Sequence, residues 1–84
     1  MISPADFEAA AQRAQNLPSK PSNMVLLQLY GLYKQATEGD VAETRPTGFD
    51  FKALAKYDAW KSLAGTSPDE ARQQYVALVT ELAG

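Results

Sequence analysis

The sequence contains neither cysteine nor histidine. Without cysteine there is no disulfide, no thiolate nucleophile and no cysteine-ligated zinc site. Without histidine the chain lacks the most common general base and metal ligand, which excludes catalytic triads of the Ser-His or Cys-His kind. Glycine-rich phosphate-binding motifs are also absent. We therefore expect a protein that is not an enzyme and has no metal site or cofactor.

Positive charge is scarce as well. Eight Lys and Arg residues stand against ten Asp and Glu residues, for a formal net charge of −2. A surface that binds nucleic acid must be basic, so we expect no nucleic-acid partner. Any anionic ligand must be held by a local cluster of cations.

Long apolar runs are missing too. No stretch approaches the roughly 20 residues that a membrane-spanning helix needs, and the first residues do not resemble a signal peptide. The absence of cysteine fits a reducing compartment, so we expect a cytoplasmic protein. The length of 84 residues fits a single domain that spans residues 1–84.

Helix signals divide the chain into four segments. Apolar residues at helical spacing predict helices over residues 4–17, 23–38 and 51–63, and a fourth that begins at Pro68 and has its last apolar position at Leu82. The predicted N-caps are Ser3, either Ser22 or Asn23, Asp50, and Ser67. The predicted stops are Pro18, Gly39 and Gly65. With no strand-like alternation and no sustained heptad, the sequence predicts an all-α, monomeric helical bundle.

The second predicted helix has an unusually wide apolar surface. On a helical projection, Val25 and Leu29 fall in one arc of roughly 80° to 140°, while Leu26, Leu27 and Tyr30 fall in another of roughly 180° to 300°. One arc can pack on the bundle. The second arc has two interpretations: the helix is central and contacts neighbours on both sides, or this arc is a ligand surface.

Three residues in the second arc favour the ligand surface. Tyr30, Tyr33 and Lys34 are spaced at i, i+3 and i+4, so we expect their tips to converge on one patch. A phenol ring can stack on a planar base, a phenol hydroxyl can bond a phosphate oxygen, and an ammonium can pair with phosphate charge. On the third segment Lys56 is a second candidate phosphate cation. Tyr75, on the apolar stripe of the fourth segment, fits the core when it is considered alone.

These residues belong to a longer motif. The run YGLYKQATEGD at residues 30–40 resembles the Y-x-x-[YF]-K-Q-A-T-x-G-D signature of acyl-CoA-binding proteins. Arg45-Pro46, the run KYDAW at residues 56–60 and the run LAGTS at residues 63–67 continue the same pattern. Phe7 in the alanine-rich first segment and the stretch from Ala71 to Val76 complete a resemblance that covers essentially the whole chain.

The resemblance implies a four-helix bundle with up-down-down-up topology and one bound long-chain acyl-CoA. It implies that Tyr33 stacks on the adenine and that Lys34, Lys56 and Tyr30 hold the ribose 3′-phosphate. Tyr75 would contact the head group or the start of the acyl chain. Gly31 and Leu32 would belong to the same binding segment, and Leu26 and Leu27 would border the acyl groove.

The chain departs from the family pattern at three places. Gln15 stands where many members have a lysine that helps to bind CoA phosphates, so we expect a weaker contact there. Tyr57 replaces the first tryptophan of the usual W-D-A-W run, and the lysine-rich C-terminal tail of many members is absent. All three departures remove positive charge or ring area, so they bear on affinity and leave the predicted fold intact.

The resemblance implies a non-catalytic carrier and pool former for medium-chain and long-chain acyl-CoA, with which transient membrane contact is compatible. An alternative hypothesis is a helical adaptor that binds a protein through the wide arc of the second helix. A thioesterase is a third hypothesis, but the chain lacks the His base and Cys nucleophile that such chemistry commonly uses.

Overall fold

The computed structural model describes residues 2–84, and these residues form four helices and no strand. The helices are α1 (Pro4–Ala14), α2 (Asn23–Glu38), α3 (Phe51–Lys61) and α4 (Pro68–Ala83). Each N-cap side chain accepts the backbone N–H three residues later, at 3.0 to 3.2 Å. The caps are Ser3, Ser22, Asp50 and Ser67. The prediction of an all-α chain with these caps is confirmed.

Two helix ends differ from the prediction. α1 ends at Ala14, and α3 ends at Lys61, two residues before the predicted Leu63. After Ala14 the backbone N–H groups of Gln15 and Asn16 donate to carbonyls three residues earlier, not four. The side-chain amide of Asn16 also donates to the carbonyl of Gln12 at 3.1 Å. The predicted extension of this helix to residue 17 is wrong, because a proline at position 18 disfavours helical geometry in the residue before it and has no N–H to donate.

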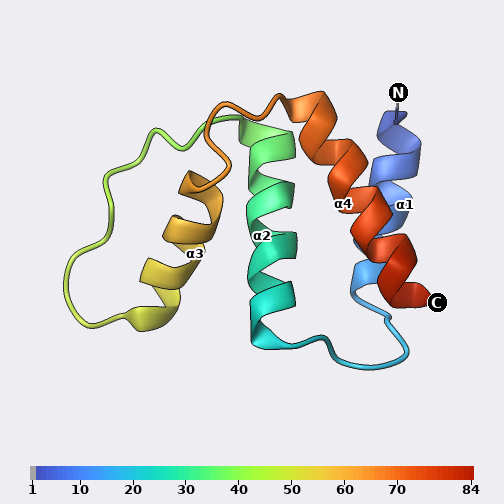
Figure 1. Cartoon of the computed structure of the whole chain (residues 1–84), viewed down its shortest axis with the longest axis horizontal. Coiled ribbons are helices and arrows are strands. Elements are labelled where there is room, and N and C mark those ends of the chain that lie inside the picture. Colours follow the sequence, from blue (N-terminus) through green and yellow to red (C-terminus); the bar gives the residue numbers. More distant parts are fainter. Residues whose placement is uncertain (1) are drawn as a thin grey trace.

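In Figure 1, α1 runs down, α2 and α3 run up and α4 runs down, which is the up-down-down-up topology seen from the opposite end. α2 and α3 are parallel, so the chain between them must return along the length of the bundle, and residues 39–50 form this long connection. α2 has two neighbouring helices, since it packs on α3 on one side and on α4 on the other. α1 packs on α4. The central position of α2 explains its wide apolar surface.

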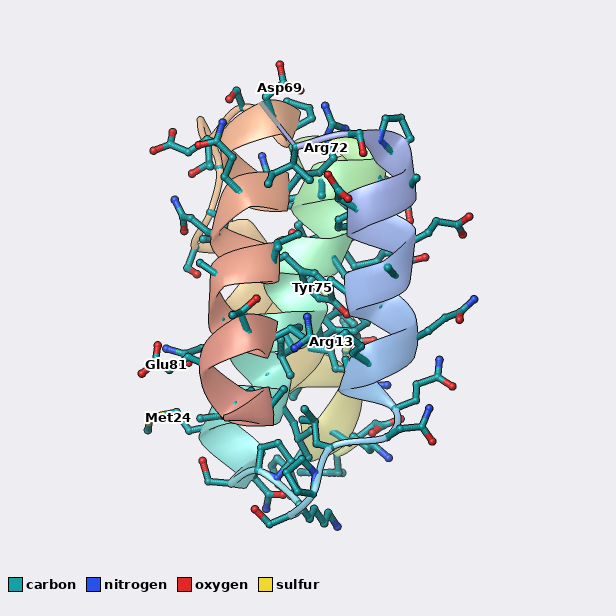
Figure 2. All side chains as sticks on the ribbon, turned by 90° about the vertical axis from the view of Figure 1, so that its right-hand side faces the viewer. Arg13, Met24, Asp69, Arg72, Tyr75 and Glu81 are labelled. Atoms are coloured by element: carbon teal, nitrogen blue, oxygen red, sulfur yellow. The ribbon has the colours of Figure 1, made fainter. Side chains whose placement is uncertain are left out.

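The main core lies among α1, α2 and α4. It consists of Phe7, Ala10, Leu29, Leu32, Ala36, Ala71, Tyr75 and Val79. Tyr75 points from α4 into the space beside α1 (Figure 2). At the upper end of the view, Arg72 of α4 donates to the Ala36 carbonyl in the last turn of α2 at 3.4 Å and pairs with Asp69. These contacts hold α4 and α2 together along their length.

α3 joins the bundle through close contacts with α2. A Cβ atom added at Gly31 would lie 2.8 Å from the Ala59 carbonyl oxygen, so the two helix backbones nearly touch there. Trp60 is buried beside this contact, and its indole N–H donates to the Gly39 carbonyl at 2.8 Å. α3 is therefore held at its C-terminal half.

Side chains also fasten the long connection to α3. Arg45 forms a two-pronged ion pair with Asp58, with both N–O distances at 3.0 Å. The Tyr57 hydroxyl donates to the Glu43 carbonyl at 3.0 Å. The hydroxyl that distinguishes Tyr57 from the tryptophan of the family pattern thus holds the connection against the helix.

A polar junction closes the upper end of the bundle. Gln35 is fully buried, and its amide donates to Asp40 Oδ1 at 2.8 Å and to the Thr66 carbonyl at 2.7 Å. Asp40 Oδ1 also accepts the Gly65 N–H at 2.9 Å. The Gly65 N–H, and secondarily the Gln35 amide, hold the pKa of Asp40 below its ordinary value of 3.8. The end of α2 is thereby joined to the turn between α3 and α4.

This junction predicts a specific acid sensitivity. Because Asp40 has a lower pKa in the folded state than its ordinary value of 3.8, its ionised form stabilises the fold above that value, and this contribution is lost as the pH falls through the folded pKa. We expect Asp40→Asn to lose less stability than the wild type on acidification from about pH 5 to about pH 3. Urea unfolding across this range measures the difference, and parallel pH profiles would contradict it.

Candidate functional site

Two hollows lie on either side of a ridge on α2. The ridge consists of Leu26 and Tyr30, which line both hollows. The first hollow, of about 450 Å³, lies between α2 and the end of α1, with Tyr75 of α4 at its floor. It is lined by Ala11, Ala14, Gln15, Leu26, Leu29, Tyr30, Tyr33 and Tyr75. The second is a groove of about 490 Å³ between α2 and α3. We call them the α1 hollow and the α3 groove.

The α3 groove has an apolar floor and a basic margin. Leu26 and Leu27 of α2 face Ala55 of α3 across it, so the predicted acyl-groove leucines line a groove. Its remaining lining consists of Lys20, Asn23, Tyr30, Phe51, Lys52 and Lys56. No acidic side chain lines it. Such a groove can bury an apolar chain while its margin attracts an anionic group.

Tyr30 and Lys56 meet at the α3 groove, which both residues line. The Lys56 ammonium lies 5.2 Å from the centroid of the Tyr30 ring, within cation–π distance. Both residues also line a smaller recess of about 190 Å³ toward the long connection, together with Trp60. The structure therefore brings together a phenol from α2 and a cation from α3, two residues 26 positions apart in the sequence.

Lys34 lies on the α3 side of Tyr30. Its ammonium is 4.9 Å from the centroid of the Trp60 ring and forms an ion pair with Glu38 one turn later. The hydrogen bond that Lys34 donates to the Glu38 carboxylate raises the pKa of Lys34 above its ordinary value, although partial desolvation acts in the opposite direction. Lys34 is therefore charged at neutral pH, and its ammonium is already paired with the Glu38 carboxylate.

Tyr33 points away from α3, toward α1 and α4. Its ring stacks on Phe7 at 5.5 Å and is tilted toward Tyr75 at 5.9 Å, and Phe7 lies 5.2 Å from Tyr75. Phe7 and Tyr75 are buried, whereas Tyr33 is exposed. Burial, and secondarily Tyr33, raise the pKa of Tyr75. Tyr33 and Tyr75 of this trio line the α1 hollow, where a planar base could stack on the exposed Tyr33 ring.

The expected convergence of three tips on one patch holds only in part, because Tyr30 and Tyr33 line the α1 hollow together and Lys34 does not. Tyr33 contacts the aromatic rings of α1 and α4, whereas Lys34 contacts Trp60 of α3. Tyr30 lies between them and lines both hollows. Contacts with neighbouring helices thus direct Tyr33 toward α1 and α4 and Lys34 toward α3.

Two residues of the predicted binding segment are buried. Leu32 belongs to the core, and Gly31 lies against the backbone of Ala59. Neither lines the hollows described above. Their contacts set the position of α2 relative to α3 and α4. Gln15 is the C-cap of α1, and it does line the α1 hollow.

Four further residues lie at these hollows or beside Lys34 without a sequence signal that assigned them there. They are Glu38, Lys20, Lys52 and Phe51. Glu38 could have been found as an i+4 partner of Lys34. The other three lie outside α2 and meet the groove only through the fold. Among residues 2–84, no group of side chains has the composition and proximity needed to hold a metal ion.

Comparisons with known proteins identify the family of this chain. The family model for Acyl CoA binding protein matches residues 4–79. An acyl-CoA-binding protein of Dictyostelium discoideum is 51% identical over 77 residues, which are 92% of this chain and 92% of that protein. An acyl-CoA-binding protein of Brassica napus is also 51% identical, over 92% of this chain and 84% of that protein.

A solved structure extends the similarity to the fold. The crystal structure of Oryza sativa acyl-CoA-binding protein 2 superposes with a TM-score of 0.89 at 46% identity, and the match covers 93% of this chain and 87% of that one. The family model, the relatives and the solved structure each match most of the chain. This chain belongs to the acyl-CoA-binding protein family.

Proposed function

We propose that this chain binds medium-chain and long-chain acyl-CoA without transforming it, as a carrier and pool former in the cytoplasm. The observation that carries the proposal is the Tyr30–Lys56 contact between an aromatic hollow and an apolar groove. A fatty acyl-CoA has the matching chemistry, with a planar base, clustered phosphates and an apolar tail. Family membership makes this function preferable to the helical adaptor.

The CoA head group is assigned to the Tyr30–Lys56 contact and to the α1 hollow. Tyr33 stacks on the adenine, and Tyr30, Lys34 and Lys56 hold the ribose 3′-phosphate. Two cations from different helices and one phenol give the phosphate charge-assisted hydrogen bonds, which are the strong ones. Tyr75 meets the head group or the start of the acyl chain, and Gln15 offers an uncharged amide where many relatives have a lysine.

The acyl chain is assigned to the α3 groove. Leu26 and Leu27 border it, and each methylene removed from water favours binding by about 0.8 kcal/mol. A groove that covers about ten methylenes can therefore compete with micelles and membranes on the same scale. Gly31 and Leu32 serve this site through packing, because they fix the spacing of α2 from α3 and α4.

The proposed function also includes the extent of the domain, its oligomeric state and its contact with membranes. The domain spans residues 1–84, acts as a monomer and contacts membranes transiently, with no metal or cofactor. Among residues 2–84, no helix has the length and hydropathy of a membrane span. A non-catalytic function fits a sequence without histidine or cysteine. Release of free thiol from acyl-CoA above background would contradict it.

A titration series tests the function directly. The chain is titrated by calorimetry with CoA, a short-chain CoA ester and a long-chain CoA ester, each at two salt concentrations. We expect affinity to rise from CoA to the long-chain ester and to fall with salt, because apolar burial and charge pairing both contribute. Free fatty acid of the same length is the control. Equal affinity for fatty acid and its CoA ester would contradict the head-group assignment.

The Lys34–Glu38 ion pair predicts a gain of affinity. A bound phosphate must compete with the Glu38 carboxylate for Lys34. We expect Glu38→Gln to strengthen binding of palmitoyl-CoA by about two- to fivefold, a modest effect because the ion pair is partly exposed. Calorimetry measures it, and Glu81→Gln at the far end of α4 is the matched control (Figure 2). Unchanged or weaker binding by the Glu38 variant would contradict the competition.

A further inference from the structure

Two phenylalanines are exposed at the start of α3. Phe49 is 90% exposed and Phe51 is 73% exposed. A hydrogen bond of 3.0 Å from the Phe51 N–H to the Phe49 carbonyl keeps both residues in one tight turn. Large apolar side chains gathered on a surface mark a site of interaction more often than single ones do. We call Phe49 and Phe51 the aromatic rim.

Lysines surround the aromatic rim. Phe51 lines the α3 groove together with Lys20, Lys52 and Lys56. Three of the eight cations of a chain with net charge −2 thus gather at one groove, and no carboxylate lines it. Asp50 lies between the two phenylalanines, but its carboxylate accepts the Ala53 N–H at 3.0 Å and caps the start of α3. The local surface combines exposed aromatic rings with positive charge.

The rim also has a defined place in the bundle. The first turns of α2 and α3 lie at the same end of the molecule, at the bottom of Figure 1. The linker residue Lys20 precedes α2 and meets Phe51 and Lys52 across the groove at that end. Apolar and cationic groups therefore come from separate segments to one end of the bundle, where a flat partner can reach them together.

We propose that this end of the molecule docks on an anionic lipid bilayer. Phe49 and Phe51 enter the boundary between head groups and acyl chains, and Lys20 and Lys52 pair with anionic lipid head groups. Aromatic residues and lysines in one surface are the combination that binds such an interface. The α3 groove then opens toward the lipid. This docking deepens the transient membrane contact of the proposed function, on which it rests, by naming the surface and the lipid charge, and it requires no bound acyl-CoA.

The charge distribution disfavours a second copy of the chain as the partner. A twofold dimer through the aromatic rim would place the same patch of both copies together. Lys20 and Lys52 of one copy would then face the equivalent lysines of the other, which is unfavourable. An anionic bilayer supplies the missing negative charge and also accepts the two rings.

Vesicle sedimentation without acyl-CoA tests the docking. We expect binding to phosphatidylcholine vesicles that contain about one third phosphatidylserine, weaker binding to phosphatidylcholine alone, and loss at high salt. Phe49→Ser and Phe51→Ser should each weaken binding by about tenfold, as expected for withdrawing one ring from the interface. Lys52→Gln should weaken it by about fivefold.

A matched control separates the rim from general charge. Lys61→Gln removes a lysine of α3 that lies outside the groove, in the last turn of the helix and so at the other end of the bundle from the rim. This variant should bind vesicles like the wild type. Equal losses for Lys52→Gln and Lys61→Gln would overturn the proposal, as would equal binding to both kinds of vesicle.

A fluorescent substitution tests the insertion itself. Trp60 is the only tryptophan of the wild type and is buried, so Phe49→Trp adds a second, exposed reporter. Its emission should shift to shorter wavelength with anionic vesicles and be quenched by brominated lipid, while the wild-type emission stays unchanged. No shift, or concentration-dependent dimerisation without vesicles, would overturn the proposal.

The test distinguishes the docking from acyl-CoA binding. Phe49 lines neither hollow, so Phe49→Ser should bind acyl-CoA in solution as the wild type does. Loss of vesicle binding with intact acyl-CoA binding supports the docking surface. Failure of the wild type to bind acyl-CoA would contradict the proposed function and leave the vesicle result standing.

Discussion

Replacement of Gly31 by alanine should lower the free energy of unfolding by about 2–3 kcal/mol. Alanine is the better helix former by up to about 1 kcal/mol, so propensity alone predicts the opposite sign. The added Cβ would lie 2.8 Å from the carbonyl oxygen of Ala59 and 3.1 Å from its carbonyl carbon. Both atoms belong to the backbone of α3, which has no rotamer to change. The two helices must therefore move apart.

Urea unfolding, followed by helical circular dichroism and by Trp60 fluorescence, measures the loss. Gln28→Ala, at an exposed position of the same helix, is the control and should change stability by no more than about 0.5 kcal/mol. A Gly31→Ala protein as stable as the wild type would contradict the close approach of α2 and α3. Because Lys56 lies on α3 and Tyr30 on α2, the same separation should also weaken acyl-CoA binding.

Local signals account for how well the helices could be predicted. Each N-cap is a serine or aspartate whose side chain bonds a nearby N–H, and this interaction spans only three residues. Prolines and glycines likewise act on their own neighbours. The predicted first residue of each helix is therefore confirmed. The end of α1 was harder to place, because apolar spacing continues to Leu17 while the backbone has already left the helix at Gln15.

The site depended on contacts that no local pattern encodes. The projection of α2 places Tyr30, Tyr33 and Lys34 on one side of the helix. Where each tip points is decided by Phe7, Trp60 and other residues of different helices. The i+4 partner Glu38 was within reach of the sequence, but an exposed pair on a helix is too common to predict on spacing alone.

The family resemblance supplied what spacing could not. Lys56 is 22 residues from Lys34 in the sequence, and only the shared motif placed both on one ligand. The structure adds the physical link, because both ammonium groups lie over aromatic rings along the boundary between α2 and α3. The exposure of Phe49 and Phe51 had no sequence signal, since an aromatic residue beside a helix start is as compatible with a core as with a surface.

Lys34→Ala should weaken palmitoyl-CoA binding by roughly tenfold to a hundredfold. A charge-assisted hydrogen bond to phosphate contributes about 1.5–3 kcal/mol when it is shielded from water, and about 1.4 kcal/mol corresponds to a factor of ten. Lys34 is partly shielded, since its ammonium lies over the buried Trp60 ring. The Glu38 ion pair that the free protein gives up on binding places the expected loss toward the lower end of this range.

Lys61→Ala is the matched control for that loss. Lys61 also lies over an aromatic ring, 5.8 Å from the centroid of Tyr57, but it is exposed and lines neither hollow. Calorimetry with palmitoyl-CoA should show a loss of affinity for Lys34→Ala well above that for Lys61→Ala. The salt dependence should also flatten for the Lys34 variant, because one cation fewer faces the phosphate. Equal losses would mean that lysines act only through the overall charge of the chain, and the assignment of Lys34 to the phosphate would then be wrong.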